Sequence, residues 1–242
     1  MADLANLLSE DSPALPRERK GNAVYHAVKR AIILRSVAPG MTLGEQQIAA
    51  AMGCSQGTVR EALLRLEQDG LVARRGYHGT VVSNTSAEEA AQMARIRIDI
   101  ECEGIRRATK TATAEDTERL DDIVAGMATT EAAGDGYALS ELDRQFHTVL
   151  FQLADLTALE PVLMRCVLHM HRFTFGNGAG GAARADTAPL PSAAAQHRDI
   201  VAAVRSGDPD KAAKTMRAHI ENVIGYWSPR LRQAMKKAAA PQ

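Results

Sequence analysis

Residues 39–72 read PGMTLGEQQIAAAMGCSQGTVREALLRLEQDGLV. A Pro-Gly turn opens this stretch, and the apolar spacing of GEQQIAAAMG predicts a short helix that ends at Gly53. Ser55 can cap the following helix, QGTVREALLRLEQDG, through its hydroxyl group. Two helices joined by such a short turn are typical of a helix-turn-helix motif.

The flanking residues extend this motif to a small domain. Upstream, apolar residues recur at helical spacing between residues 21 and 35. Downstream, the β-branched runs LVAR and TVVS surround the turn RGYHG and predict a hairpin. Residues 17–83 therefore predict a winged helix-turn-helix, a fold that inserts its third helix into the DNA major groove.

The charge distribution also indicates two domains. The net charge of the chain is zero, but residues 17–83 hold ten basic and five acidic residues. Residues 84–242 hold nineteen basic and twenty-one acidic residues, and residues 1–16 hold three acidic residues and no basic one. A basic segment joined to a mildly acidic one favours two domains with different partners.

Residues 39–72, together with the wing sequence RRGYHGTVV at 74–82, resemble the DNA-binding domain of the GntR family of bacterial transcription regulators. The resemblance implies that Arg60 contacts DNA from the recognition helix. It also implies phosphate contacts from Ser55 and Thr58, and Gly79 at the tip of the wing.

Two positions depart from the family pattern. Gln46 and Gln56 stand where the family usually has arginine. Glutamine can pair bidentately with adenine, whereas arginine favours guanine, so we expect a shifted operator sequence, a weaker phosphate grip, or both. The alternative for residues 17–83 is a small helical domain that binds protein rather than DNA.

The rest of the chain predicts an antiparallel all-α helical bundle. SAEE at residues 86–89 has the pattern of a capping box and predicts the start of a long helix that runs to about Lys110. Five further helices follow, at about 114–133, 138–153, 157–175, 192–207 and 209–227. The fold class expected is thus mostly α, with an N-terminal winged helix-turn-helix and a C-terminal bundle.

Composition narrows the class of protein further. No apolar run is long enough for a membrane span, and the N-terminus lacks the pattern of a signal peptide. The three cysteines are far apart and odd in number, which fits reduced thiols in a cytoplasmic protein.

Four candidate metal ligands share the inward faces of three predicted helices. Asp143 and His147 are one helical turn apart, and His197 and His219 each lie on an apolar stripe. Imidazole and carboxylate suit zinc first, and also nickel, iron or manganese. Spacing alone leaves two interpretations open, a divalent metal site and hydrogen-bonded core histidines.

Residues 87–227 resemble the FCD effector-binding domain of the FadR-type GntR regulators. The resemblance rests on RIRIDIE (95–101), DRQFH (143–147) and QHRDIVAAVRSGDPDKAAKTMRAHI (196–220). It implies that Asp143 and the three histidines above bind one divalent metal.

Arg97 is a further inward polar residue and needs an acceptor. Glu101, one turn away, is one partner; a small carboxylate effector held bidentately is the other, and the resemblance implies the second. His169 and His171 face different sides of their helix, and we expect a surface or helix-end role for them, although one could line the cavity.

Together these observations predict a metabolite-responsive transcription regulator, with a repressor as the first expectation. It would bind double-stranded operator DNA as a homodimer and respond to a small organic acid. The expected division is a tail at 1–16, the DNA-binding domain at 17–83, a linker at 84–86, the effector domain at 87–228 and a tail at 229–242. The rival from another class is a metal-dependent hydrolase, although no HExxH motif is present. A third interpretation is that the metal ion has a structural role only and stabilises the helical bundle.

Overall fold

The computed structural model describes residues 17–76, 79–178, 191–228 and 231–235. The chain divides into two compact units, Met1–Thr85 and Ser86–Gln242. The expected tail at 1–16, two residues of the wing turn and most of the segment between the helices expected at 157–175 and 192–207 lie outside the described residues. Within the described ranges, no helix has both the length and the apolar composition that a membrane span requires.

The first unit has the winged helix-turn-helix architecture that the sequence predicts. Its helices are α2 (Arg17–Ile33), α3 (Glu45–Ala51) and α4 (Gln56–Gln68), and its strands are β1 (Thr42–Leu43), β2 (Val72–Arg74) and β3 (Thr80–Val82). The antiparallel sheet has the order β1-β3-β2, with Val81 opposite both Thr42 and Ala73. The sequence patterns did not predict β1, because two residues are too short for a periodic signal.

Helix α4 forms because its two faces differ. Ser55 accepts a hydrogen bond from the Thr58 backbone amide and so caps the first turn, as predicted. Val59, Leu63 and Leu66 bury one face against the rest of the unit. The opposite face, which includes Gln56, Arg60 and Gln68, is exposed.

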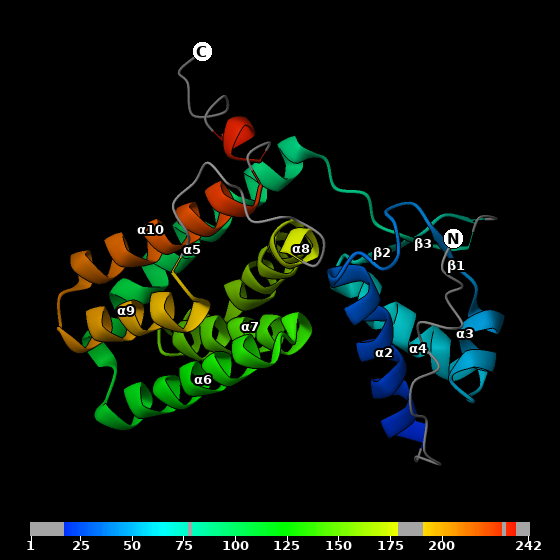
Figure 1. Ribbon diagram of the computed structural model, residues 1–242, viewed down its shortest axis with the longest axis horizontal. Coiled ribbons are helices and arrows are strands. Elements are labelled where there is room, and N and C mark those ends of the chain that lie inside the picture. Colours follow the sequence, from blue (N-terminus) through cyan, green and yellow to red (C-terminus); the bar gives the residue numbers. More distant parts are fainter. Residues whose placement is uncertain (1–16, 77–78, 179–190, 229–230, 236–242) are drawn as a thin grey trace. The chain divides into compact units, whose positions relative to one another are not determined.

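The second unit is a bundle of helices. Its elements are α5 (Ala87–Thr111), α6 (Ala114–Ala133), α7 (Gly136–Gln152), η2 (Thr157–Leu159), α8 (Glu160–Gly178), α9 (Ala193–Arg205) and α10 (Pro209–Trp227). Figure 1 shows α5 beside α10, and α6 beside α7. Helix α5 also packs against α7 and α8, so it touches most of the bundle. The mostly α fold class is confirmed.

Local sequence sets where these helices begin. Ser86 with Glu89, and Thr113 with Asp116, form reciprocal capping boxes at the starts of α5 and α6. Asp208 caps α10 ahead of a proline in its first turn. The predicted starts of these three helices are therefore confirmed.

The C-terminal segment differs from the tail expected at 229–242. Residues 231–235 are helical, and Leu231 is buried in the bundle core. Arg95 donates a hydrogen bond of 2.9 Å to the Met235 carbonyl. Because an apolar side chain is buried here, this part of the expected tail belongs to the bundle.

Candidate metal centre and nucleic-acid interface

Asp143, His147, His197 and His219 come together inside the helical unit. Helix α7 carries the first two one turn apart, α9 carries His197 and α10 carries His219. All four are buried, and one ligand atom from each lies within 4.8 Å of the others. Such a group could hold a metal ion, and it contains the donors that zinc and similar divalent ions take from proteins.

Each histidine of this group uses its Nδ1 atom outside the cluster. The ring of His197 donates from Nδ1 to the Ala193 carbonyl at 2.7 Å, and that of His219 to Oε1 of Gln196 at 3.3 Å. Nδ1 of His147 contacts Oε2 of Glu101. With the proton on Nδ1, each Nε2 carries a lone pair, the state that a metal ligand requires.

One close approach in the cluster brings two acceptor atoms together. Nε2 of His197 lies 3.2 Å from Oδ1 of Asp143. This nitrogen is buried and has no hydrogen-bond partner among the described residues. A lone pair that faces a carboxylate oxygen in a buried site is unfavourable unless a cation lies between them, so the residues present fit a metal ion.

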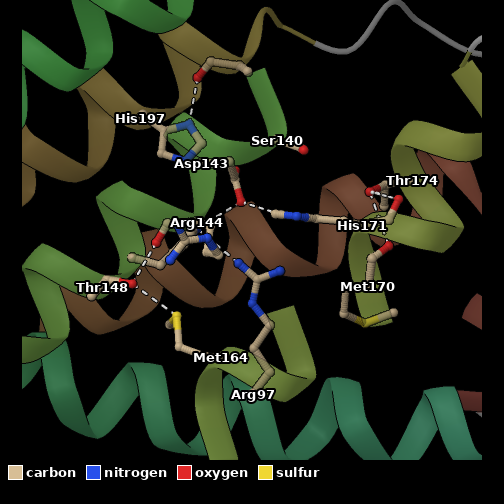
Figure 2. A network of polar contacts seen from close by, with 12 residues as sticks. Arg97, Ser140, Asp143, Arg144, Thr148, Met164, Met170, His171, Thr174 and His197 are labelled. Atoms are coloured by element: carbon tan, nitrogen blue, oxygen red, sulfur yellow. Dashed lines mark hydrogen bonds and ion pairs between the residues drawn. The ribbon is translucent and has the colours of Figure 1, made fainter. Parts of the chain in front are cut away.

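Asp143 is held ionised by its neighbours. Burial by itself would raise the pKa of this carboxyl group, but the neighbouring His147 and the hydrogen bond from His171 hold the pKa well below its usual range. His171 Nε2 lies 2.8 Å from Oδ2 of Asp143, and Figure 2 shows the two side chains pointing toward each other. One carboxylate oxygen thus faces His171 and the other faces His197.

This contact corrects the expectation for helix α8. His169 and His171 are only 3% and 2% exposed, so neither is a surface residue. The expectation failed because α8 is covered on several sides by α5, α7 and α10. Of the two, His171 contacts a candidate ligand, so it is a candidate site residue that the helix periodicity alone did not identify.

His219 is kept neutral by its surroundings. Burial lowers its pKa well below the ordinary histidine value, and the neighbouring His197 and His147 lower it further. A neutral imidazole has a free lone pair at neutral pH, so His219 can act as a ligand without first losing a proton.

Arg97 reaches the same region from α5 (Figure 2). Its Nε lies 2.6 Å from Oε1 of Glu101, and its Nη2 lies 2.9 Å from Nε2 of His147. Burial by itself would raise the pKa of the Glu101 carboxyl group. The neighbouring His147 and Arg97 outweigh burial and lower this pKa below its usual value. The sequence left Glu101 and a carboxylate effector open as partners of Arg97; Glu101 is a partner, and one terminal nitrogen points toward the cluster.

The candidate DNA-contacting residues lie in the first unit. Gln46, Gln56 and Arg60 are exposed on α3 and α4. Arg60 Nε forms an ion pair of 2.8 Å with Glu45, which holds the guanidinium at the surface. Gly79 has a φ angle of +69°, which favours glycine at the end of the wing turn.

The two hydroxyl residues at the start of α4 behave differently. Ser55 is exposed, whereas Thr58 is only 3% exposed. The Thr58 hydroxyl lies 2.9 Å from that of Ser55. The Thr58 side chain is thus largely shielded from solvent, and the phosphate contacts expected for Ser55 and Thr58 stay predictions.

Two family models match the chain in the same order as its two units. The model described as "Bacterial regulatory proteins, gntR family" matches residues 20–82, and the FCD domain model matches residues 92–222. The chain belongs to the GntR family and carries an FCD domain. The resemblance inferred from the sequence is therefore confirmed.

Similar proteins support this assignment along most of the chain. The HTH-type transcriptional repressor RspR of Escherichia coli is 24% identical over 208 residues, which cover 86% of this chain and 89% of the relative. The HTH-type transcriptional repressor NanR of Cronobacter sakazakii is 26% identical over 241 residues, covering 88% and 87%. The names of both relatives describe them as transcriptional repressors.

Solved structures agree on the fold. Escherichia coli McbR/YncC has a TM-score of 0.72 at 17% identity and covers 88% of this chain and 97% of its own. A GntR transcriptional regulator from Rhodococcus sp. RHA1 has a TM-score of 0.66 at 25% identity, covering 92% and 100%. Because the families and relatives are transcription regulators rather than enzymes, the GntR assignment removes the support for a hydrolase.

Proposed function

We propose that this GntR regulator is a repressor that binds a divalent metal ion and a small carboxylate effector in its FCD domain. The observation that carries the proposal is the convergence of one carboxylate and three histidines, with their ligand atoms within 4.8 Å of one another. The hydrogen bonds at the three Nδ1 atoms support it, since they leave every Nε2 able to coordinate.

The proposed site residues have two roles, metal binding and carboxylate binding. Asp143, His147, His197 and His219 would hold the ion, with zinc as the first expectation. The bound ion would supply a positive charge that attracts an anion. Arg97 would contribute a guanidinium group, whose planar donors match a carboxylate.

The DNA-binding role is proposed for exposed residues of the first unit. Arg60 and Gln56 lie on the exposed face of α4, the helix that a winged helix-turn-helix inserts into the major groove. Gln46 and the wing at Gly79 would add contacts on either side. We infer a homodimer on a palindromic or near-palindromic operator, because paired recognition helices read paired half-sites.

Coupling between the two activities would pass along the chain itself. Strand β3 ends at Val82 and α5 begins at Ala87, so only residues 83–86 join them. Helix α5 also carries Arg97, so a change at the candidate effector site acts on the helix that follows the linker. An effector alters DNA affinity only if it binds two dimer arrangements with different affinity.

A DNA-binding titration tests this proposal. The purified protein is titrated into operator DNA selected from a random pool, with zinc, after chelation, and with a panel of small organic acids. We expect the affinity to fall steeply with salt and to change with at least one acid only when the ion is present. An affinity that is equal under all conditions would contradict the sensor role, and a melting temperature that alone responds to chelation would favour an ion that only stiffens the bundle.

A further inference from the structure

Glu101 lies between the candidate metal ligands and the candidate carboxylate receptor. It is 3% exposed and sits on α5, two helices away in sequence from His147 on α7. One oxygen, Oε1, lies 2.6 Å from Arg97 Nε, and the other, Oε2, contacts Nδ1 of His147. Glu101 therefore contacts both a candidate metal ligand and the candidate carboxylate receptor.

The protons in this network are fixed by elimination. A guanidinium group has only donors, so Arg97 Nη2 must donate to Nε2 of His147 across 2.9 Å. Nε2 therefore holds the lone pair and Nδ1 holds the proton. That proton points to Oε2 of Glu101, which accepts it. The carboxylate thus selects the tautomer in which His147 can coordinate an ion through Nε2.

We propose that Glu101 is a positioning residue that couples metal binding to carboxylate binding. It fixes the coordinating tautomer of His147, and it holds Arg97 through Nε so that Nη2 and the ion compete for the same lone pair of His147. The inference rests on the proposed metal site and adds to it the residue that links this site to Arg97.

The competition has a consequence for the order of binding. When Nε2 of His147 coordinates an ion, it can no longer accept a hydrogen bond from Arg97. The Nη2 donor then loses its acceptor, while Nε remains paired with Glu101. A buried donor without an acceptor is unfavourable, and an incoming carboxylate supplies one. The carboxylate should therefore bind more tightly after the ion than before it.

Zinc titration of the full chain tests the positioning role. Chelator-treated wild-type protein, Glu101→Gln and the control Glu103→Gln are compared by calorimetry. Glu103 lies on the same helix, is about half exposed at 51%, and forms a surface ion pair of 2.9 Å with Arg107. We expect Glu101→Gln to weaken zinc binding about 10- to 100-fold and Glu103→Gln to leave it unchanged. Equal zinc affinity in wild type and Glu101→Gln would overturn the proposal.

A second measurement avoids dependence on a variant that fails to fold. Nitrogen-15 NMR of the histidines in the wild-type protein should show His147 coordinated through Nε2, with its proton on Nδ1, once zinc is added. Coordination through Nδ1 would overturn the role of Glu101. If wild-type protein bound no zinc at all, the proposed function itself would fail, which separates the two claims.

Acetate, the simplest carboxylate probe, tests the order of binding. We expect acetate to bind the zinc-loaded wild-type protein at least about tenfold more tightly than the zinc-free protein, as a coupling of the usual size would give. Arg97→Met should remove most of this difference. Equal acetate affinity with and without zinc, or no acetate binding to the zinc-loaded protein, would count against the coupling.

Discussion

Oδ1 of Asp143 lies 3.2 Å from Nε2 of His197, although the two residues belong to different helices. The proton of the His197 ring is used at Nδ1, where it is donated to the Ala193 carbonyl. Two buried acceptors therefore face each other. A cation between them resolves this arrangement, and the nearby His147 and His219 complete a set of donors for it.

Removing two of these donors should abolish metal retention. In His197→Ala/His219→Ala only Asp143 and His147 remain, and two ligands are too few for a tight zinc site. Metal content of the purified protein, measured by mass spectrometry, should fall to background. The control His26→Ala, an exposed histidine of the first unit, should retain the wild-type content. Full occupancy in the double variant would remove these ligands from the account.

Arg60→Ala should weaken operator binding and spare the helical unit. Loss of a base-contacting arginine costs about 1–3 kcal/mol of binding free energy. Fluorescence anisotropy with selected operator DNA would measure the loss, and zinc content should not change. Arg107→Ala, which removes an exposed arginine of α5, is the matched control and should bind DNA as wild type does. Undiminished affinity in Arg60→Ala would reject α4 as the recognition helix.

The stability of the metal-free protein should fall as the pH drops below about 6.5, the ordinary pKa of histidine. Burial lowers the pKa of His219 in the folded state, so above this pH the ring is neutral in both states and contributes nothing. Below it, the unfolded chain takes up a proton that the folded chain does not, which costs up to about 1.4 kcal/mol per pH unit.

Urea unfolding at pH 7.5 and 5.5 would measure this loss in chelator-treated protein. His219→Gln cannot titrate, so it should lose less stability than wild type over the same interval. An identical loss in both proteins would show that His219 is not held neutral by the fold. Asp143 does not interfere, because its depressed pKa places its contribution below about pH 4.

Gly104→Ala should destabilise the bundle by about 1–3 kcal/mol through overpacking. A Cβ atom at Gly104 would lie 2.7 Å from Cδ2 of the buried Phe151 side chain, so either this ring or helix α5 would have to shift. In the matched variant Gly126→Ala, the new Cβ would meet the end of the Leu142 side chain at 3.3 Å. That side chain can rotate, and alanine favours a helix by up to about 1 kcal/mol.

Chemical unfolding would compare these two glycine variants directly. Gly104→Ala should also weaken zinc binding, because α5 carries Glu101 to its contact with His147. Equal stability of the two variants would mean that the α5–α7 approach is not tight.

Sequence patterns were informative wherever one residue decides a local outcome. The helix expected at about 114–133 matches α6, which Thr113 and Gly134 cap at its two ends, and helix periodicity placed His197 and His219 on inward faces. Periodicity identifies the buried face of a helix but not the axial offset between two packed helices. The contacts of Glu101 and His171 depend on that offset, so they emerged only with the three-dimensional packing.

Anomalous diffraction from zinc-soaked crystals tests the central claim most directly. We predict a single strong peak at the zinc edge within coordination distance of Asp143, His147, His197 and His219. A map with no peak at these four side chains, or with zinc bound only at the protein surface, would contradict the metal centre.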